Sequence, residues 1–493
     1  MPPSPVRART SPWLIVALLC VGQMMIVLDQ NIVNVALPAV QRGLGLSSGN
    51  LVWVVNAYVI PFGGLLLLAG RLGDLLGRKT VFLTGVVLFS AASVLCGLAD
   101  SETALIASRF LQGIGGAITS ACLLGMVATV FPEGRKRAQA IAAYSFASAG
   151  GGAAGPLLGG VLTEWLDWHW IFFINAPIGA VLVLAGVRAL PRERGEGLRQ
   201  GQGQGIDLLG ALLVTGGMTL LVYAIVDAER IGWTAARTLL LGPLALLLLI
   251  GFVTRQATAA TPLLPLRLFR SRSLAAANLV QFLLIAGMFG LLFFGTLYLQ
   301  RVRGYGALRA GLGFAPIAVV IAAVSLGLSA RLLTRFGPRA LLLTGLGLVT
   351  TAFVLLSFAR ADGVYAVDFL PAGLVMGLGF GLAAPAMTGL GMAAVAPAEA
   401  GITSGLFNTT QQLGGAIGLT VLSTLANARA DALAAAGKSR ADALIGGYHT
   451  AFLTAAGCAL AALLVGAVLL KAAPSAHAVE ENPVPHGMDA VAA

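Results

Sequence analysis

The chain alternates between apolar runs of about 20 residues and short segments that carry charge, glycine or proline. A helix of this length crosses the hydrocarbon core of a bilayer. Bounding each run by its charged or Gly/Pro-rich flanks predicts fourteen membrane spans. The predicted spans are 13–36, 51–70, 80–99, 104–129, 138–162, 169–190, 206–227, 237–255, 274–299, 309–330, 339–359, 366–392, 402–425 and 450–471. The pattern predicts an all-α integral membrane protein.

Composition excludes two other classes of protein. Of the 493 residues, 58% are hydrophobic and 10% charged, whereas a soluble domain has about 25% charged residues. The net charge of +11 comes from short clusters between apolar runs rather than from a basic face, so nucleic-acid binding is not expected. The four cysteines and four histidines have no metal-ligand spacing, so we expect neither a metal nor another cofactor.

The distribution of Lys and Arg predicts the orientation in the membrane. With the N-terminus inside, the inner segments hold about twice as many Lys and Arg residues as the outer loops, as the positive-inside rule requires. An even number of spans puts both termini on the same side. We therefore expect a multi-pass protein of the cytoplasmic membrane with both termini in the cytoplasm.

An internal repeat indicates two related halves. Residues 330–339 align without gaps on Gly70–Lys79 at an offset of 260 residues, with Arg331 on Arg71 and Gly337 on Gly77. Such a repeat is typical of transporters built from two homologous halves. The predicted organisation is an N-terminal six-helix half at 1–190, a cytoplasmic linker at 191–205, an inserted two-helix segment with its connection at 206–273, a C-terminal six-helix half at 274–471 and a cytoplasmic tail at 472–493.

Four motifs occur in order along the first half. They are the first-span segment Leu28–Pro38, the basic turn Gly70–Lys79, the segment Arg109–Gly116 and the glycine-rich segment Gly151–Gly160. Together they resemble the motifs of the fourteen-helix drug:proton antiporters of the major facilitator superfamily, and the resemblance covers essentially the full chain. It implies the major facilitator fold, with two six-helix halves and an inserted central helix pair.

The same resemblance implies a function. It indicates proton-coupled export of amphipathic drug-like or antibiotic compounds by alternating access, with a small-molecule substrate, protons and the lipid bilayer as partners and with the protein as a monomer. A proton-coupled carrier of small metabolites is the alternative on the same fold, although such carriers usually lack the Gly155-Pro156 motif. A non-transporting sensor is a third class, against which Asp29 and Arg109 argue. No nucleophile, base or metal cluster suggests an enzyme.

Two charged residues lie well inside predicted spans of the first half, Asp29 and Arg109. Charges are costly in the bilayer core and often mark ion pathways. Burial favours the neutral form of a carboxylate, so Asp29 is suited to bind and release a proton. It is the only acid within a span of this half and hence the natural partner of Arg109, which the resemblance implicates in proton transfer. The structural alternatives are a carboxylate satisfied by neighbouring helices and an arginine anchored on backbone carbonyls.

The basic turn and the glycine-rich segment predict contacts between helices. By resemblance, the turn is a cytoplasmic gate that holds the first half against the second. Gly151, Gly155 and Gly159 share one helix face and permit close approach, while Pro156 bends the helix; by resemblance, this motif seals the halves together on one side. The gate residues are Gly70, Arg71, Asp74, Gly77, Arg78 and Lys79, and the antiporter helix motif comprises Gly151, Gly155, Pro156, Gly159 and Gly160.

Isolated polar residues on apolar helices are candidates for a substrate cavity. Such groups turn away from lipid, although many only join helices. The second half has only Asp368 near a span, which gives a second acidic coupling site little support. The cavity candidates are Asn34, Asn56, Gln112, Gln281, Asn408 and Gln411.

Overall fold

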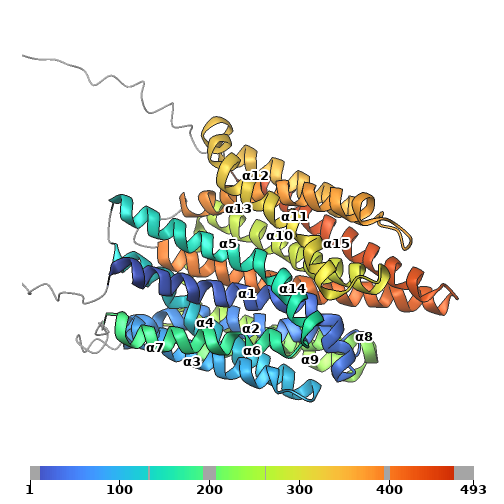
Figure 1. The fold of residues 1–493 in the computed structure, drawn as a ribbon, viewed down its shortest axis with the longest axis horizontal. Helices are drawn as coiled ribbons and strands as arrows, with labels where there is room; N and C mark the ends of the chain where they lie inside the picture. The colour runs from blue at the N-terminus through green and yellow to red at the C-terminus, as the bar shows by residue number, and fades with distance from the viewer. Residues whose placement is uncertain (1–10, 132–133, 192–206, 261, 394–399, 471–493) are drawn as a thin grey trace, which may run out of the picture.

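The computed structural model describes residues 11–131, 134–191, 207–260, 262–393 and 400–470, and all regular structure in these ranges is helical. The helices run along the long axis of the molecule (Figure 1). The first half contains α1 (Pro12–Leu44), α2 (Leu51–Leu76), α3 (Arg78–Gly97), α4 (Glu102–Val130), α5 (Gly134–Trp165), α6 (Trp170–Phe173) and α7 (Asn175–Ala189).

Two further helices precede the second half. They are α8 (Leu208–Ile231) and α9 (Ala236–Thr258). The remaining elements are η2 (Leu266–Arg270), α10 (Arg272–Leu297), η3 (Tyr298–Val302), α11 (Ala307–Ala323), η4 (Val324–Leu328), α12 (Ser329–Leu356), η5 (Tyr365–Phe369), α13 (Leu370–Ala393), α14 (Ala400–Ala435) and α15 (Arg440–Leu469). Within the described ranges, eleven spans are long and apolar enough to cross a membrane. With α5, α11 and α14, they match the predicted fourteen, so the all-α membrane fold is confirmed.

The bundle has two ends, which we name after glycines in their turns. The Gly437 end carries the connections 45–50, 98–101, 166–169, 232–235, 303–306, 357–364 and 436–439. It lies on the right of Figure 1. The opposite Gly77 end carries the turn between α2 and α3, the start of α1 and the end of α15.

The internal repeat is visible in the backbone. Gly77, between α2 and α3, has φ 91° and ψ 128°. Gly337, aligned with it, has φ 78° and ψ 161° and interrupts α12 at the matching joint between two spans. Glycine is the residue that adopts positive φ without strain. The repeat is therefore confirmed at this turn, whereas the domain boundaries stay a prediction.

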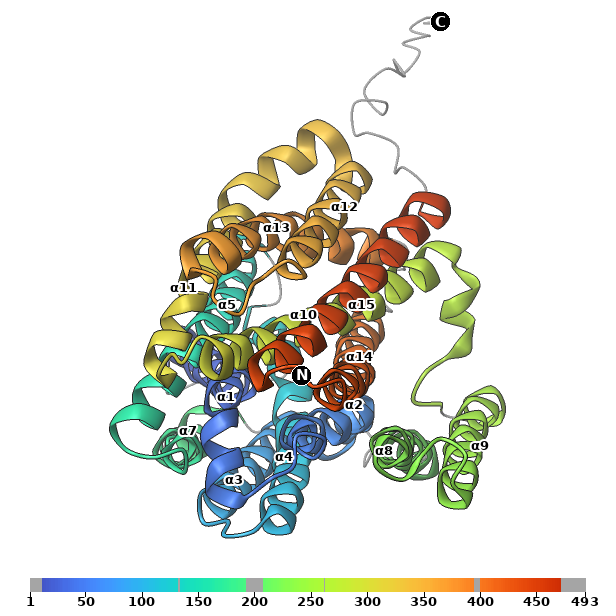
Figure 2. The ribbon, with the colours of Figure 1, turned by 90° about the vertical axis from the view of Figure 1, so that its right-hand side faces the viewer.

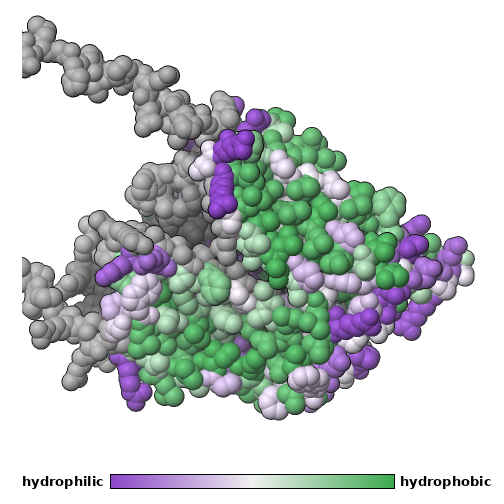
Figure 3. All heavy atoms as spheres, turned by 45° about the horizontal axis from the view of Figure 1, so that its top comes forward, coloured by the Kyte–Doolittle hydropathy of each residue, from purple (hydrophilic) through white to green (hydrophobic). Residues whose placement is uncertain are grey.

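Helix packing brings the two halves together along two seams. In the first half α1 packs on α5 and α4 on α3 and α2, and in the second α12 packs on α13 and α10 on α14 and α15. Across the halves, α5 packs on α11 and α2 on α14. In the end view, α8 and α9 lie beside the bundle, with α8 against α2 and α14 (Figure 2). Apolar side chains cover the middle of the face in Figure 3, as a lipid-facing surface requires.

The helices differ from the predicted spans most clearly in two places. α14 extends to Ala435 and α15 begins at Arg440, so the predicted loop at 426–449 is mostly helical. The reason is its alanine-rich sequence, because alanine favours helix even where the residues are too polar to suggest a span. The predicted span 169–190 is broken between α6 and α7. Pro177 accounts for the break, since it has no N–H to donate to the carbonyl of Phe173.

Candidate functional site

Asp29 of α1 and Arg109 of α4 form a buried ion pair in the first half. Arg109 Nη1 lies 2.8 Å from Asp29 Oδ2, and the two side chains are 1% and 0% exposed. Arg109 Nε also donates to the carbonyl of Val54 on α2, over 3.0 Å. The predicted pairing of Asp29 with Arg109 is therefore present. The alternative role of Arg109, an anchor on a backbone carbonyl, is present as well. Each charge needs the other, because an unpaired buried charge is strongly destabilising.

Three neutral side chains complete the surroundings of the carboxylate. Gln112 Nε2 and Asn175 Nδ2 each donate to Asp29 Oδ1 over 2.8 Å. Ser93 Oγ accepts from both amides over 3.0 Å and donates to a backbone carbonyl of α6 over 2.8 Å. We call Asp29, Ser93, Arg109, Gln112 and Asn175 the Asp29 cluster; all five are buried.

The Asp29 cluster suits the ionised carboxylate. The side chains whose hydrogen bonds to Asp29 are described, those of Arg109, Gln112 and Asn175, all act as donors. A protonated carboxyl carries a hydrogen of its own and needs an acceptor for it. Protonation must therefore break at least one of these contacts. Since they join α1 to α4 and α7, binding of a proton has a structural consequence for three helices.

Aromatic rings separate the Asp29 cluster from water. The guanidinium carbon of Arg109 lies 4.5 Å from the ring centroid of Tyr58 and 5.7 Å from that of Phe172. Both rings are fully buried. Cation–π attraction of this kind strengthens when the cation is desolvated. The ion pair is thus held in a dry site within the first half.

Two members of the cluster, Ser93 and Asn175, were missed by the sequence analysis. Asn175 begins α7 directly after the helix break, and Pro177 follows two residues later. An asparagine just before a proline inside an apolar run was the available signal, because proline marks the break at which a polar side chain is redirected. Ser93 gave no signal, since an isolated serine is common in apolar helices.

The glycine-rich helix α5 uses two neighbouring faces for different partners. A Cβ at Gly155 would lie 2.6 Å from Asn31 Cβ, and one at Gly159 would lie 2.6 Å from the carbonyl oxygen of Ile32, both on α1. A Cβ at Gly160 would instead lie 2.6 Å from Leu308 Cα on α11. Gly151 also faces α1, whereas Pro156 meets Gly311 of α11. The row Gly151–Gly155–Gly159 therefore fixes α5 within its own half, and the Pro156–Gly160 face contacts the other half.

Polar contacts between the halves gather at the Gly437 end. Glu164 Oε2 accepts from the backbone N–H of Leu308 over 2.8 Å and so caps the start of α11 from the other half. Gln300 Nε2 donates to the carbonyl of Val35 over 2.7 Å, and Arg301 donates to Gln41. These contacts tie α1 and α5 to the helices of the second half at this end.

The predicted gate makes its described contacts within the first half. Arg78 donates to the carbonyl of Gly125 over 3.4 Å. Lys79 Nζ donates to the carbonyls of Val187 and Leu190 over 2.8 and 2.7 Å. Arg71 is exposed, Gly70 lies in open space and Gly77 forms the turn. The side chain of Asp74 lies outside the described residues, so its predicted role stays a prediction.

The predicted cavity residues separate into four groups. Gln112 belongs to the Asp29 cluster, and Asn34 donates to a carbonyl of its own helix over 3.2 Å. Asn56 Nδ2 crosses the α2–α14 seam to Thr420 Oγ1 over 2.6 Å. The structure brings Gln281 and Gln411 together across α10 and α14, and Asn408 is exposed on α14 near Gln411. Their part in substrate binding stays a prediction.

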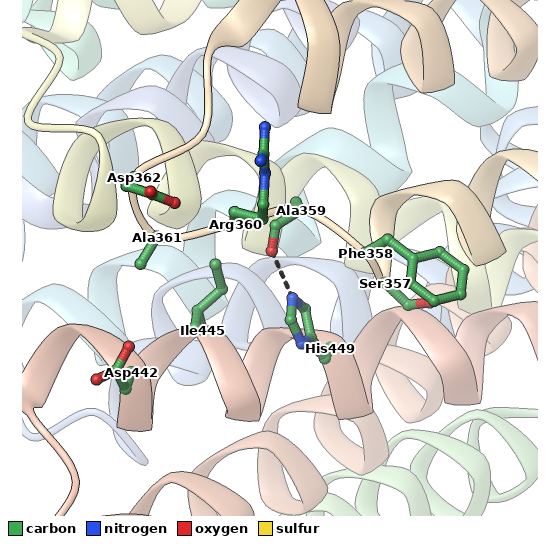
Figure 4. Close-up of a pocket in the computed structure, with 9 residues that line it drawn as sticks. All are labelled: Ser357, Phe358, Ala359, Arg360, Ala361, Asp362, Asp442, Ile445 and His449. Carbon is green, nitrogen blue, oxygen red and sulfur yellow. Dashed lines mark hydrogen bonds between the residues drawn. The ribbon is translucent and has the colours of Figure 1, made fainter.

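A pocket at the Gly437 end lies apart from these residues. It is formed by the 357–362 connection and by Asp442, Ile445 and His449 of α15 (Figure 4). His449 Nε2 lies 2.6 Å from the carbonyl oxygen of Ala359. Arg360 Nε is paired with Asp368 Oδ1 over 3.2 Å. The His449 contact fastens the connection to α15, and none of the predicted site residues lines this pocket.

Comparison with known proteins agrees with this architecture. The Major Facilitator Superfamily profile matches residues 19–419. The chain is 39% identical over 465 residues to the puromycin resistance protein pur8 of Streptomyces alboniger, covering 93% of this chain and 91% of that protein. It is 38% identical over 413 residues to the cephamycin export protein CmcT of Amycolatopsis lactamdurans, covering 83% and 84% of the two chains. The solved nucleoside transporter NupG aligns with a TM-score of 0.67 at 14% identity, covering 94% of this chain and all of that one.

Sequence and fold point to the same assignment. The profile spans most of the chain, the two export and resistance proteins are alike over more than four fifths of it, and the helical fold matches that of a solved transporter. The predicted family is therefore confirmed, and an enzyme is excluded. The protein belongs to the major facilitator superfamily of transporters.

Proposed function

We propose that this transporter exports amphipathic, antibiotic-like compounds across the cytoplasmic membrane in exchange for protons, by alternating access of its two halves. The observation that carries the proposal is the Asp29 cluster, a dry carboxylate–arginine pair in the first half. The two relatives that are named for resistance and export support the direction of transport and the class of substrate.

Protonation of Asp29 is the step that couples the proton to movement. It removes the charge that holds Arg109 and displaces at least one donor, which weakens the link from α1 to α4 and α7. The same helix α1 carries Val35 and Gln41, which contact the second half at the Gly437 end. Loosening α1 therefore lets the contacts between the halves at that end rearrange. For exchange, the proton enters from the outer side and leaves to the cytoplasm, where its release restores the pair and the arrangement closed at the Gly437 end.

The Gly77 end faces the cytoplasm in this proposal. Arg71, Arg78 and Lys79 of the first basic turn and Arg331 and Arg339 of the second support this orientation. The Gly437 end is then the outer end. Its contacts between the halves, made by α1 and α5, support an inward-facing arrangement of this structure.

The direct test uses energised inverted membrane vesicles and a panel of dyes and antibiotics. Addition of an exported compound is expected to release protons from the acidified lumen, because import into the inverted vesicle is exchanged for protons. Vesicles without the protein are the control. Sodium dependence in place of proton release, or uptake of small metabolites by whole cells, would instead favour the alternative carrier.

Replacing Asp74 by asparagine is expected to lower the transport rate while leaving substrate affinity nearly unchanged. The reason is the gate role that the motif implies, since a gate residue changes the rate of conformational exchange rather than the binding site. Initial rates over a range of substrate concentrations in vesicles measure both quantities. A large loss of affinity at a normal maximal rate would contradict a gate.

Replacing Glu164 by alanine is expected to loosen the outer closure. The variant loses the acceptor that caps Leu308 of α11, whereas Glu164→Gln keeps a side-chain oxygen there. The readout is a Cys introduced by Ala307→Cys after the four native cysteines have been replaced. We expect this Cys to react a few-fold faster with an impermeant thiol reagent added outside when Glu164 is alanine than when it is glutamate. Glu102→Ala is the matched control, because Glu102 accepts from Asn50 within the first half at the same end. Equal labelling in the Glu164 and Glu102 variants would rule out the proposed closure.

A further inference from the structure

The second half carries two glutamine side chains on facing helices, Gln281 of α10 and Gln411 of α14. Gln281 Nε2 donates to Gln411 Oε1 over 3.3 Å. Gln281 is 5% exposed. Its Oε1 atom is buried and has no hydrogen-bond partner among the described residues. A buried amide oxygen left in this way is costly, so an occupant that donates a hydrogen bond to it gains free energy.

The glutamine pair faces the space between the halves. On α14, Gln412 packs against Gly63 of α2, because a Cβ built on Gly63 would lie 2.8 Å from the Cβ of Gln412. Gly414 packs against Phe282 of α10. At 100° per residue, Gln411 lies on the strip of α14 between these two contact faces. The strip therefore borders the region enclosed by α2 of the first half and α10 of the second.

Exposure along this strip decreases toward the Gly437 end. Asn408, one turn nearer the Gly77 end, is exposed, and Gln411 is half-buried. Gly415, one turn further, is covered by the ring of Phe289, from which a Cβ would lie 2.8 Å away. The strip is therefore accessible from the Gly77 end, and Gln411 lies at the border between its exposed and its buried part.

The surroundings of the pair are uncharged. Asn278 and Thr410 are satisfied by each other and by the helix, because Thr410 Oγ1 donates to Asn278 Oδ1 over 2.9 Å and Asn278 Nδ2 donates to the carbonyl of Leu274 over 3.0 Å. In sequence, α10 has no charged residue after Arg272 and α14 has none before Arg429. Neutral amides without a nearby charge discriminate by hydrogen bonding rather than by attraction of an ion.

We propose that Gln281 and Gln411 bind the exported compound through a neutral hydrogen-bond donor that lies beside an acceptor. Gln281 Oε1 accepts from a hydroxyl or N–H group, and Gln411 Nε2 donates to a neighbouring carbonyl or hydroxyl oxygen. The half-buried rings of Phe282 and Phe289 provide the apolar surface for the rest of the molecule. The substrate class is therefore an uncharged amphipathic compound. This inference rests on the proposed export function, with the proton carried separately by the Asp29 cluster.

Binding to the purified protein tests the inference without depending on proton coupling. The probes are chloramphenicol, which is neutral and has hydroxyl and N–H groups beside a carbonyl, and tetraphenylphosphonium, a cation without donors or acceptors. We expect the wild type to bind chloramphenicol and to prefer it to the cation. Gln281→Met and Gln411→Met, which keep size but lose the amide, are expected to weaken chloramphenicol binding about tenfold. Thr350→Val on α12, whose hydroxyl bonds only to its own helix, is the control and is expected to bind normally.

A second variant guards against a loss of fold. Gln281→Glu keeps the shape of the side chain and adds a carboxylate, so saturable binding of tetraphenylphosphonium is expected to strengthen, whereas a misfolded protein would lose saturable binding of both probes. Chloramphenicol binding that is unchanged in Gln281→Met, or a wild type that prefers the cation, overturns the inference. Proton release from wild-type vesicles on export of either probe is measured in parallel. If any compound of the panel causes release while the binding results fail, only the inference is overturned. If no compound of the panel causes release, the proposed function falls with it.

Discussion

Replacing Asp29 by asparagine is expected to abolish proton-driven export. Asparagine keeps the shape of the side chain and one acceptor oxygen, but it cannot gain or lose the proton. Arg109 and the amides of Gln112 and Asn175 would then surround a group whose charge no longer changes. Proton release from energised inverted vesicles, recorded on addition of an exported compound, measures the loss.

The same change leaves Arg109 buried without its counter-charge. Breaking a buried ion pair by removal of one partner costs about 3–5 kcal/mol of stability. The double variant Asp29→Asn/Arg109→Gln removes both charges and separates the two effects, because it keeps the fold neutral while still lacking the proton site. We expect it to accumulate in the membrane near the wild-type level and to exchange substrate down a gradient, yet to show no coupling to protons.

Coupled export by either variant would contradict the assignment of Asp29. Asp29→Glu is the matched control, since it keeps a carboxylate at the site with a side chain one methylene longer. We expect it to retain coupling at a reduced rate, because the longer side chain disturbs the contacts with Gln112 and Asn175 but still accepts a proton. The comparison of Asp29→Asn with Asp29→Glu therefore separates the need for a carboxylate from the need for the exact packing of the site.

The sequence could reveal the charged core of the site but not its full composition. Asp29 and Arg109 stood out because charge inside an apolar span is costly and therefore rare. Ser93 and Asn175 did not, because their contribution depends on a helix break that brings the start of α7 against α3. Hydropathy predicted that the spans exist, but it did not predict where α14 ends and α15 begins. These helices extend beyond the apolar segments because of helix propensity rather than burial in lipid.

The faces of α5 illustrate a second limit of sequence reasoning. A row of glycines four residues apart predicts close approach to some helix, but it does not identify the partner. In the structure, Gly155 and Gly159 meet α1, while Gly160, one residue further, meets α11 of the other half. Adjacent residues differ by 100° around the helix, so one segment serves both purposes. Only tertiary packing assigns Pro156 and Gly160 to the contact between halves.

That assignment makes Gly160 the second residue with a large expected effect. In Gly160→Ala, the new methyl group would lie 2.6 Å from Leu308 Cα and 2.8 Å from the carbonyl oxygen of Ala307. Both are backbone atoms, so α11 must move away. Overpacking of this kind costs about 1–3 kcal/mol. If the substitution destabilises only the state closed at the Gly437 end, a cost of 1.4 kcal/mol changes the equilibrium between the closed and open states about tenfold.

We therefore expect Gly160→Ala to favour the state open at the Gly437 end and to lower the export rate about tenfold. The measurements are export by vesicles and labelling, from outside, of a Cys introduced by Ala307→Cys. Gly152→Ala on the same helix is the matched control, because its methyl group meets only Val27 at 3.9 Å. Gly155→Ala should instead disturb α1 within the first half and lower the yield of folded protein. Normal export by Gly160→Ala, or equal labelling in the Gly160 and Gly152 variants, would show that this face does not control closure.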